Sequence, residues 1–175
     1  MAKKVAVMAV NPVNGMGLFQ YLETFFENGI EYKTFAVSDS KEIKTNSGIT
    51  LILDDVVANL KNKENEFDAV VFSCGDAIPK YRENIDKQYN QDMLAVLKAF
   101  ADKGKIIIGH CATAMLMESL GIIDNKKVAV HPYGKPAIQK AIATDEEFEI
   151  DGNIYTAQTE NSLSLLLPEL LKVLK

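Results

Sequence analysis

Residues 106–117 read Ile106-Ile107-Ile108-Gly109-His110-Cys111-Ala112-Thr113-Ala114-Met115-Leu116-Met117, and they are the most informative part of the sequence. β-Branched residues typical of a buried strand lead into a cysteine, and a helical pattern begins directly behind it. The pattern predicts a sharp strand-to-helix turn with the sulfur of Cys111 facing the N-terminal end of a helix. Backbone N–H groups and the helix dipole favour a thiolate there, so Cys111 is the candidate nucleophile. The alternative is a buried structural thiol, because free cysteine is among the most buried residue types.

Outward from this turn, short apolar runs alternate with helical patterns. The predicted strands cover residues 5–10, 32–37, 69–72, 105–108 and 127–130. The predicted helices cover residues 17–27, 88–102, 115–120, a weaker candidate at 134–142, and 162–174. Several strands are apolar on successive residues, as in strands covered on both faces. The alternation predicts an α/β fold, with a mostly parallel sheet, helices on both faces and right-handed crossovers.

Two further segments have the pattern of β-hairpins, and the terminal helix is rich in leucine. Residues 44–53 turn around Asn46-Ser47-Gly48, and residues 148–155 turn around Asp151-Gly152. Pro168 either starts the regular part of the terminal helix or kinks it, because an interior proline costs about 3 kcal/mol. The leucines cover more than one face of that helix, so we expect part of it to pack on the core or on a partner.

Length and composition indicate one globular domain, which we place at residues 1–175. The net charge of −5 gives no electrostatic argument for binding nucleic acid or an anionic membrane. No apolar run approaches the roughly 20 residues that span a bilayer, and the first residues have the pattern of a strand, not of a signal peptide. Two cysteines make a weak disulfide framework, so we predict free thiols and a cytoplasmic location.

Motifs for a metal or a cofactor are missing from the sequence. Two cysteines and two histidines match the ligand count of a zinc site, but their spacing contains none of the usual zinc-binding units. Gly15-Met16-Gly17 lacks the third glycine of a dinucleotide-binding loop, and no Walker A pattern occurs. We therefore predict that the protein uses neither a metal nor a cofactor.

The cysteines and histidines share one position in the pattern: each lies at or just past the end of a predicted strand. They are Cys74, His110, Cys111 and His131. Ligands of open α/β sheets bind beyond the carboxyl ends of the strands, so we expect these side chains at one edge of the sheet.

Each histidine has two interpretations. His131 ends the strand predicted after Cys111, and adjacent parallel strands lie about 4.8 Å apart, so its ring is placed to act as a general base or to stabilise the thiolate. Alternatively, His131 caps the backbone near Pro132. His110 points away from the nucleophile in extended backbone, so it packs under the sheet or faces a subunit contact unless the turn brings it into the site.

The loop after strand 69–72, Ser73-Cys74-Gly75-Asp76, supplies further candidates. Cys74 is either a resolving thiol for Cys111 or a small filler residue in a tight loop. Gly75 allows the backbone to approach a ligand, and its N–H, together with that of Ala112, is a candidate oxyanion donor.

The chain resembles the ThiJ/PfpI superfamily, which includes intracellular cysteine peptidase-like proteins, glyoxalase and chaperone-like proteins and the parkinsonism-associated protein. The resemblance covers nearly the whole chain and rests on segments 3–7, 27–30, 47–50, 67–71, 100–105, the Cys111 turn, 120–123, 128–132 and 151–156. It implies a flavodoxin-like three-layer sandwich and a homodimer. By this resemblance Cys111 matches the family nucleophile, His131 matches a histidine found near it in some members, and Cys74-Gly75 falls on a Gly-Gly turn.

The sequence also departs from the family pattern. Ala112 stands where the peptidase-like branch has a histidine, and Gly17 stands where many members have a glutamate bonded to the thiol. We expect Asn14 to replace that glutamate as a neutral partner of the thiol, and Asp76 to orient His131. The His-x-Glu pair of the amidotransferase relatives is absent, because Pro132-Tyr133 follow the only downstream histidine.

Two function hypotheses follow. The first is a cysteine-dependent hydrolase, protease- or amidase-like or glyoxalase-like, in which Cys111 attacks a small-molecule or peptide substrate and His131 moves the proton. The second is a non-enzymatic redox-responsive or chaperone-like protein with a degenerate site, for which Cys74 supplies the second thiol. A flavin- or nucleotide-binding domain is a weaker third reading, because no phosphate-binding loop supports it.

Overall fold

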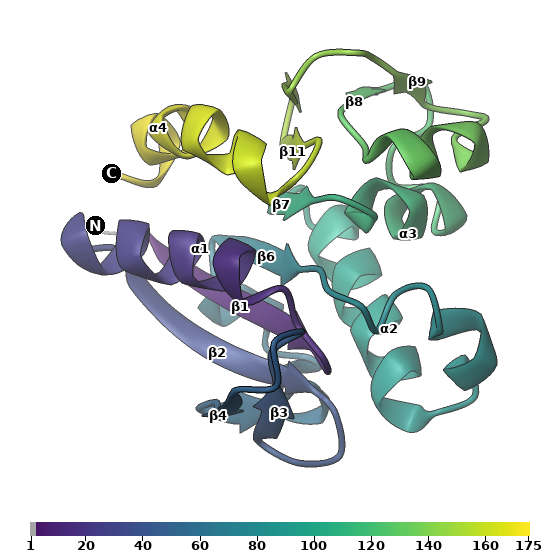
Figure 1. The fold of residues 1–175 in the computed structure, drawn as a ribbon. Helices are drawn as coiled ribbons and strands as arrows, with labels where there is room; N and C mark the ends of the chain where they lie inside the picture. Colours follow the sequence, from purple (N-terminus) through teal and green to yellow (C-terminus); the bar gives the residue numbers. More distant parts are fainter. Residues whose placement is uncertain (1–2) are drawn as a thin grey trace.

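A seven-stranded sheet forms the centre of the computed structural model, which describes residues 3–175 (Figure 1). Across the sheet the strands are β10 (Phe148–Asp151), β11 (Ile154–Ala157), β7 (Ile106–His110), β6 (Ala69–Ser73), β1 (Lys4–Val10), β2 (Glu31–Val37) and β5 (Asp55–Val56). Every neighbouring pair is parallel except β10 and β11, which form an antiparallel hairpin. The mostly parallel sheet predicted from the alternating pattern is confirmed.

Helices cover both faces of this sheet. The α-helices are α1 (Gly15–Glu27), α2 (Gln88–Asp102), α3 (Thr113–Ser119) and α4 (Leu163–Leu174). The 3₁₀ turns are η1 (Val57–Leu60), η2 (Glu64–Glu66), η3 (Tyr81–Asn84), η4 (Pro132–Ala137) and η5 (Glu160–Ser162). Helices α1 and α4 contact each other on one side, and α2 packs on the other side against β2, β6 and β7 (Figure 1). The result is the three-layer flavodoxin-like sandwich that the family resemblance implies.

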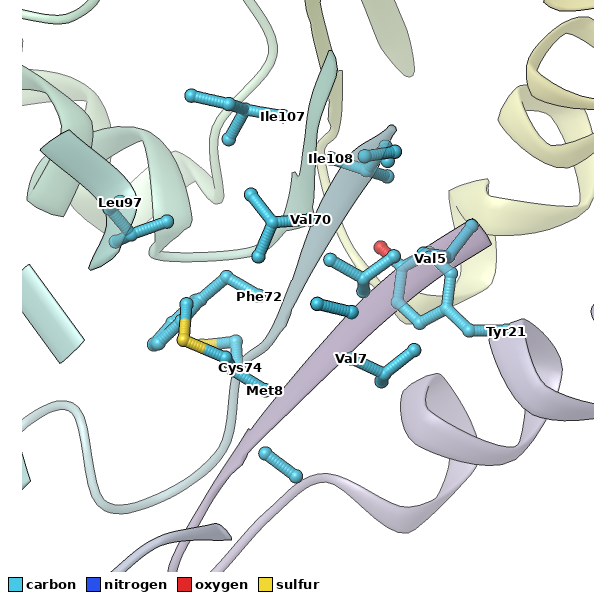
Figure 2. Close-up of a cluster of buried hydrophobic side chains, with 14 of the residues drawn as sticks. Val5, Val7, Met8, Tyr21, Val70, Phe72, Cys74, Leu97, Ile107 and Ile108 are labelled. Atoms are coloured by element: carbon cyan, nitrogen blue, oxygen red, sulfur yellow. The ribbon is translucent and has the colours of Figure 1, made fainter. Parts of the chain in front are cut away.

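The core lies on both sides of the central strands. All residues of β6 are buried, as is all of β1 after its first residue. Side chains on a strand alternate between the two faces. Figure 2 shows the outcome: Val5 and Val7 lie on the side of Tyr21 from α1, and Val70 and Phe72 lie on the side of Leu97 from α2. Burial on both faces explains why these strands have no alternating polar residues.

Several element boundaries agree closely with the sequence pattern. Helix α2 spans the predicted residues, and the first predicted hairpin forms from β3 (Glu42–Lys44) and β4 (Thr50–Ile52). Helix α1 begins at Gly15, ahead of the predicted start, because the Asn14 side chain accepts a hydrogen bond from the Gly17 N–H at 2.7 Å and caps the helix.

The segment after α3 corrects two predictions. Strand β8 (Lys127–Val128) is not part of the main sheet but pairs with β9 (Ile142–Ala143). The place beside β7 belongs to β11, which is buried along its whole length and so suits the sheet interior better than the short β8. The helix predicted over residues 134–142 is replaced by η4, whose internal Pro136 cannot donate an α-helical hydrogen bond.

The outer surfaces of α1 and α4 carry exposed apolar side chains. They include Met16, Phe19 and Phe26 on α1 and Leu165 on α4. Pro168 lies inside α4 and does not start it, and the leucines at 163, 166, 167, 170 and 174 are buried. The predicted homodimer stays a prediction. Within residues 3–175, the helices all fall short of the length and apolar character needed to cross a bilayer.

Candidate active site

The strand-to-helix turn after β7 places Cys111 in an unusual backbone conformation. Its φ is +58°, in the left-handed region that costs a residue with a side chain about 1–2 kcal/mol. Two backbone hydrogen bonds hold it there: the Cys111 N–H donates to Ala157 O at 3.1 Å, and Cys111 O accepts from the His131 N–H at 3.2 Å. The sharp turn expected from the sequence is therefore present, with α3 beginning at Thr113.

Close packing within the turn explains the glycine that precedes it. The Thr113 hydroxyl donates to His110 O at 2.7 Å, which brings the first residue of α3 against the end of β7. A Cβ atom on Gly109 would lie only 2.3 Å from Thr113 Cγ2. Glycine at 109 is therefore a requirement of this tight turn.

The turn opens into a cleft of about 740 Å³. All the residues proposed for the site from the sequence line it: Asn14, Cys74, Gly75, Asp76, His110, Cys111, Ala112 and His131. Cys111 is half-buried in its wall, whereas Cys74 is 2% exposed. The carboxyl ends of β6 and β7 thus bring both thiols to one cavity, which His131 lines from the segment after β8.

Neutral donors lower the pKa of Cys111 below the ordinary thiol value. The largest cause is a hydrogen bond from the Cys74 thiol, and the Ala112 N–H adds a second one. Partial burial and the negative charges of Glu160 and Asp76 act in the opposite direction. Cys111 is therefore the more readily ionised sulfur of the pair, and the groups within residues 3–175 that lower its pKa are neutral.

Cys74 has the opposite behaviour. Its pKa is raised because it donates its proton to Cys111, because it is buried, and because the neighbouring sulfur becomes negative. The backbone around it is fixed, since Cys74 O accepts from the Asn14 N–H at 2.9 Å. A Cβ atom on Gly75 would meet Pro12 O at 2.3 Å, so the loop after β1 packs directly on this turn.

His131 reaches the cleft by a route that the sequence did not predict. It follows β8, which lies outside the main sheet, and the backbone hydrogen bond to Cys111 O holds it near the nucleophile. Its Nδ1 accepts from the Tyr133 N–H at 3.3 Å, and its ring stacks on the Tyr133 ring at 5.1 Å. The Nδ1 atom of His131 therefore caps the backbone after Pro132, as the second interpretation of this residue expects. A neutral ring with Nδ1 as acceptor carries its proton on Nε2.

His110 points to the opposite side of the sheet. It is 1% exposed, and its Nδ1 lies 3.2 Å from the Tyr21 hydroxyl of α1. Its Nε2 has no partner within residues 3–175. Burial lowers the pKa of His110 to about 4, so the ring is neutral at pH 7. A Cβ atom on Gly17 would lie 2.5 Å from that Nε2, so the imidazole fills the space that a side chain at position 17 would need.

The buried imidazole predicts a pH-dependent stability. In the unfolded chain a histidine binds a proton near pH 6.5, whereas folded His110 does so only near pH 4, so stability falls as the pH drops below 6.5. Between pH 7.5 and pH 5 this difference amounts to about 2 kcal/mol. Urea unfolding of the wild type at both pH values measures it.

The matched control is His110→Gln, which keeps a polar side chain but removes the titrating group. This variant is expected to lose much less stability than the wild type over the same pH interval. Equal losses in the two proteins would contradict a neutral, buried His110.

Asn14 and Asp76 differ from their expected roles. The side-chain Oδ1 of Asn14 caps α1 by accepting from the Gly17 N–H, so it has a structural partner other than the thiol. The Asp76 N–H donates to the Asn46 side-chain oxygen at 3.1 Å, and within the described part of the chain His131 donates no hydrogen bond to the Asp76 carboxylate. Both residues still line the cleft.

Sequence reasoning missed Glu160, the carboxylate that faces the site from η5. It lines the cleft, and its charge raises the pKa of both Cys111 and His110. The signal lay in β11: this strand pairs with β7, and the residues after it return to the same sheet edge. Among residues 3–175, no group of three or more His, Cys, Asp or Glu side chains is placed to hold a metal ion.

Comparisons with known proteins agree with this architecture. The profile of the DJ-1/PfpI family matches residues 3–173. Protein ppBat of Bacteroides thetaiotaomicron is 65% identical over 175 residues, which cover 100% of both chains. The crystal structure of "the putative protease I from Bacteroides thetaiotaomicron" has 64% identity and a TM-score of 0.98, covering 99% of this chain and 100% of that one. Drosophila melanogaster DJ-1beta has a TM-score of 0.84 at 18% identity, over 99% and 91% of the chains, a likeness that concerns the fold alone.

Proposed function

The chain belongs to the DJ-1/PfpI family, and from this premise we propose that it is a cysteine-dependent hydrolase of a small carbonyl or acyl compound. The observation that carries the proposal is the Cys111 sulfur, which is held at a left-handed turn on a cleft and has a lowered pKa. The name "putative protease I", given to the B. thetaiotaomicron structure, supports hydrolysis as well.

The reaction begins when the Cys111 thiol loses its proton to water, which its lowered pKa favours. Cys111 Sγ bonds to the carbonyl carbon, and the electron pair of the C=O bond moves to the oxygen. The Ala112 N–H bonds the sulfur in the resting site, and as charge leaves the sulfur it becomes free to stabilise the new oxyanion. The Nε2–H of neutral His131 then donates a hydrogen bond to that oxygen, and solvent water supplies the proton that the oxygen or the leaving group takes up. With an acyl substrate, water hydrolyses the resulting thioester.

The cleft favours a small substrate over a folded protein chain. A volume of about 740 Å³ lies within the range of small-molecule sites, roughly 300–1,000 Å³. Position 112 is alanine, so the histidine that follows the nucleophile in the peptidase-like branch is missing here. A reactive aldehyde or a small ester or amide is therefore a better candidate than a peptide, and Arg82 in the cleft wall offers a cation for a substrate carboxylate.

The ionised nucleophile can be tested by alkylation. The rate of iodoacetamide modification of Cys111, plotted against pH, is expected to show a midpoint below the ordinary thiol value of about 8.5. Cys74→Ala removes the thiol donor and is expected to raise that midpoint, whereas Cys74→Ser keeps a donor and shifts it less. A wild-type midpoint at or above 8.5 would remove the activated nucleophile, and with it the proposed function.

Turnover identifies the reaction class. Methylglyoxal, p-nitrophenyl acetate and short peptide amides test the glyoxalase-like, esterase-like and peptidase-like forms of the proposal separately. Inactivity toward all three, in a protein with a low-pKa thiol, would contradict the hydrolase proposal and favour the non-enzymatic alternative.

A further inference from the structure

The two cysteines of the chain directly follow two neighbouring parallel strands, Cys74 after β6 and Cys111 after β7. Strands β6 and β7 are parallel and pair Phe72 with Gly109. Cys74 and Cys111 each come two residues after this pair, just past the ends of the strands, and both line the same cleft. We propose that these residues form a reversible disulfide when a hydroperoxide oxidises Cys111, which makes the site a redox switch. The proposal rests on the proposed function only in requiring that Cys111 be reactive.

The spacing suits a disulfide. Neighbouring strands lie about 4.8 Å apart, and disulfides join Cα atoms that are roughly 4.4–6.8 Å apart. Both backbones are anchored, Cys74 by the hydrogen bond from Asn14 and Cys111 by the one to Ala157. The bond therefore requires the side chains to move, while the strands stay in register.

Each sulfur is the hydrogen-bonding partner that shifts the pKa of the other most, and both residues line the same cleft. Figure 2 shows Cys74 on the same side of the sheet as Val70 and Phe72. The ring of His110 does not separate the two sulfurs, because it points to α1 on the opposite side of the sheet.

Exposure assigns the order of events. Cys74 is 2% exposed, whereas Cys111 is half-buried at the cleft wall. A peroxide that enters the cleft therefore meets Cys111, which is also the more acidic thiol. Cys74, which is more deeply buried than Cys111, is then the resolving residue.

The chemistry balances in two steps. The Cys111 thiolate attacks the terminal oxygen of ROOH, so an S–O bond forms, the O–O bond breaks and the alkoxide takes up a proton as ROH. Cys74 then loses its proton and attacks the sulfenic sulfur, so the S–S bond forms and the hydroxyl leaves with that proton as water. Both thiols together are oxidised by two electrons, and the peroxide is reduced.

The first step prepares the second. The charge of Cys111 and the hydrogen bond to it raise the pKa of Cys74. A sulfenic acid is neutral, so that cause disappears once Cys111 is oxidised. The Ala112 and Gly75 amides, which lower the pKa of Cys74, then stabilise the attacking thiolate.

Intact-mass and peptide mapping test the proposal. Wild-type protein treated with one equivalent of hydrogen peroxide is expected to lose two hydrogens within one chain. Tryptic digestion without reductant should then give a linked pair of segments, 64–80 and 106–126, which separates after dithiothreitol. The alkylation activity of Cys111 is expected to disappear with the disulfide and to return with the reductant.

Variants at position 74 make the test specific. Cys74→Ser and Cys74→Ala are both expected to gain oxygen atoms stepwise at Cys111 and to lose its alkylation irreversibly. Their circular dichroism before oxidation establishes that they fold.

Stepwise oxygen addition in the wild type, with no linked segments, would overturn the proposal. If Cys111 still showed its low-pKa alkylation in that experiment, the proposed function would stand and only the disulfide would fail. An unreactive Cys111 would remove both.

Discussion

Cys111→Ser is expected to lower turnover of the substrate by at least about 10³-fold, because a hydroxyl does not ionise near neutral pH and the nucleophile is lost. The substitution is nearly isosteric at a half-buried position, so the free energy of unfolding should change by less than about 1 kcal/mol. Initial rates with the best of the three test substrates, together with urea unfolding, separate the two effects.

The same replacement at the neighbouring sulfur is the control. Cys74→Ser keeps a hydrogen-bond donor beside Cys111 and is expected to cost at most about tenfold in rate, since a donor to the thiolate is retained. Retention of turnover by Cys111→Ser would show that the sulfur takes no part in the reaction.

Gly75→Ala is expected to destabilise the protein by more than about 3 kcal/mol. The new Cβ atom would lie 2.3 Å from Pro12 O, 2.5 Å from Val13 Cα and 2.7 Å from Asn14 N. All of these are backbone atoms, so no side-chain rotation relieves the contact. The loop after β1 must shift, and the hydrogen bond from Asn14 to Cys74 O shifts with it.

Gly15→Ala provides the comparison on the same loop. Its Cβ atom would meet the Thr45 side chain at 3.2 Å, a contact that a small rotation relieves, and alanine favours the helix that begins there. Its free energy of unfolding should stay within about 1 kcal/mol of the wild type. Equal stability of the two variants in urea would refute the close packing of the Cys74-Gly75 turn.

The layers of the fold could be predicted because local patterns determine them. The unbroken apolar runs of β1 and β6 indicate strands covered on both sides, and the apolar face of α2 sets its limits. The order of strands at the β7 edge could not be predicted in this way. Whether β8 or β11 lies beside β7 depends on long-range packing. The periodicity of apolar residues within one segment carries no information about such packing.

The candidate site shows the same division. Strand ends place Cys74 and Cys111 at one edge, and this could be inferred from the sequence alone. The caps formed by Asn14 and His131 depend on the detailed backbone geometry. Their hydrogen bonds therefore could not be predicted from the sequence. Glu160 could not be inferred, because its place at this edge depends on the pairing of β11 with β7, which long-range packing determines.

The contact between Gly17 and His110 constrains how this site can evolve. An acidic side chain at position 17 would collide with the imidazole, and removal of the imidazole alone would leave the buried Tyr21 hydroxyl without its partner. Each single replacement therefore passes through an impaired intermediate. We therefore expect the effects of replacing the two residues to be non-additive, as is usual for side chains that share a contact.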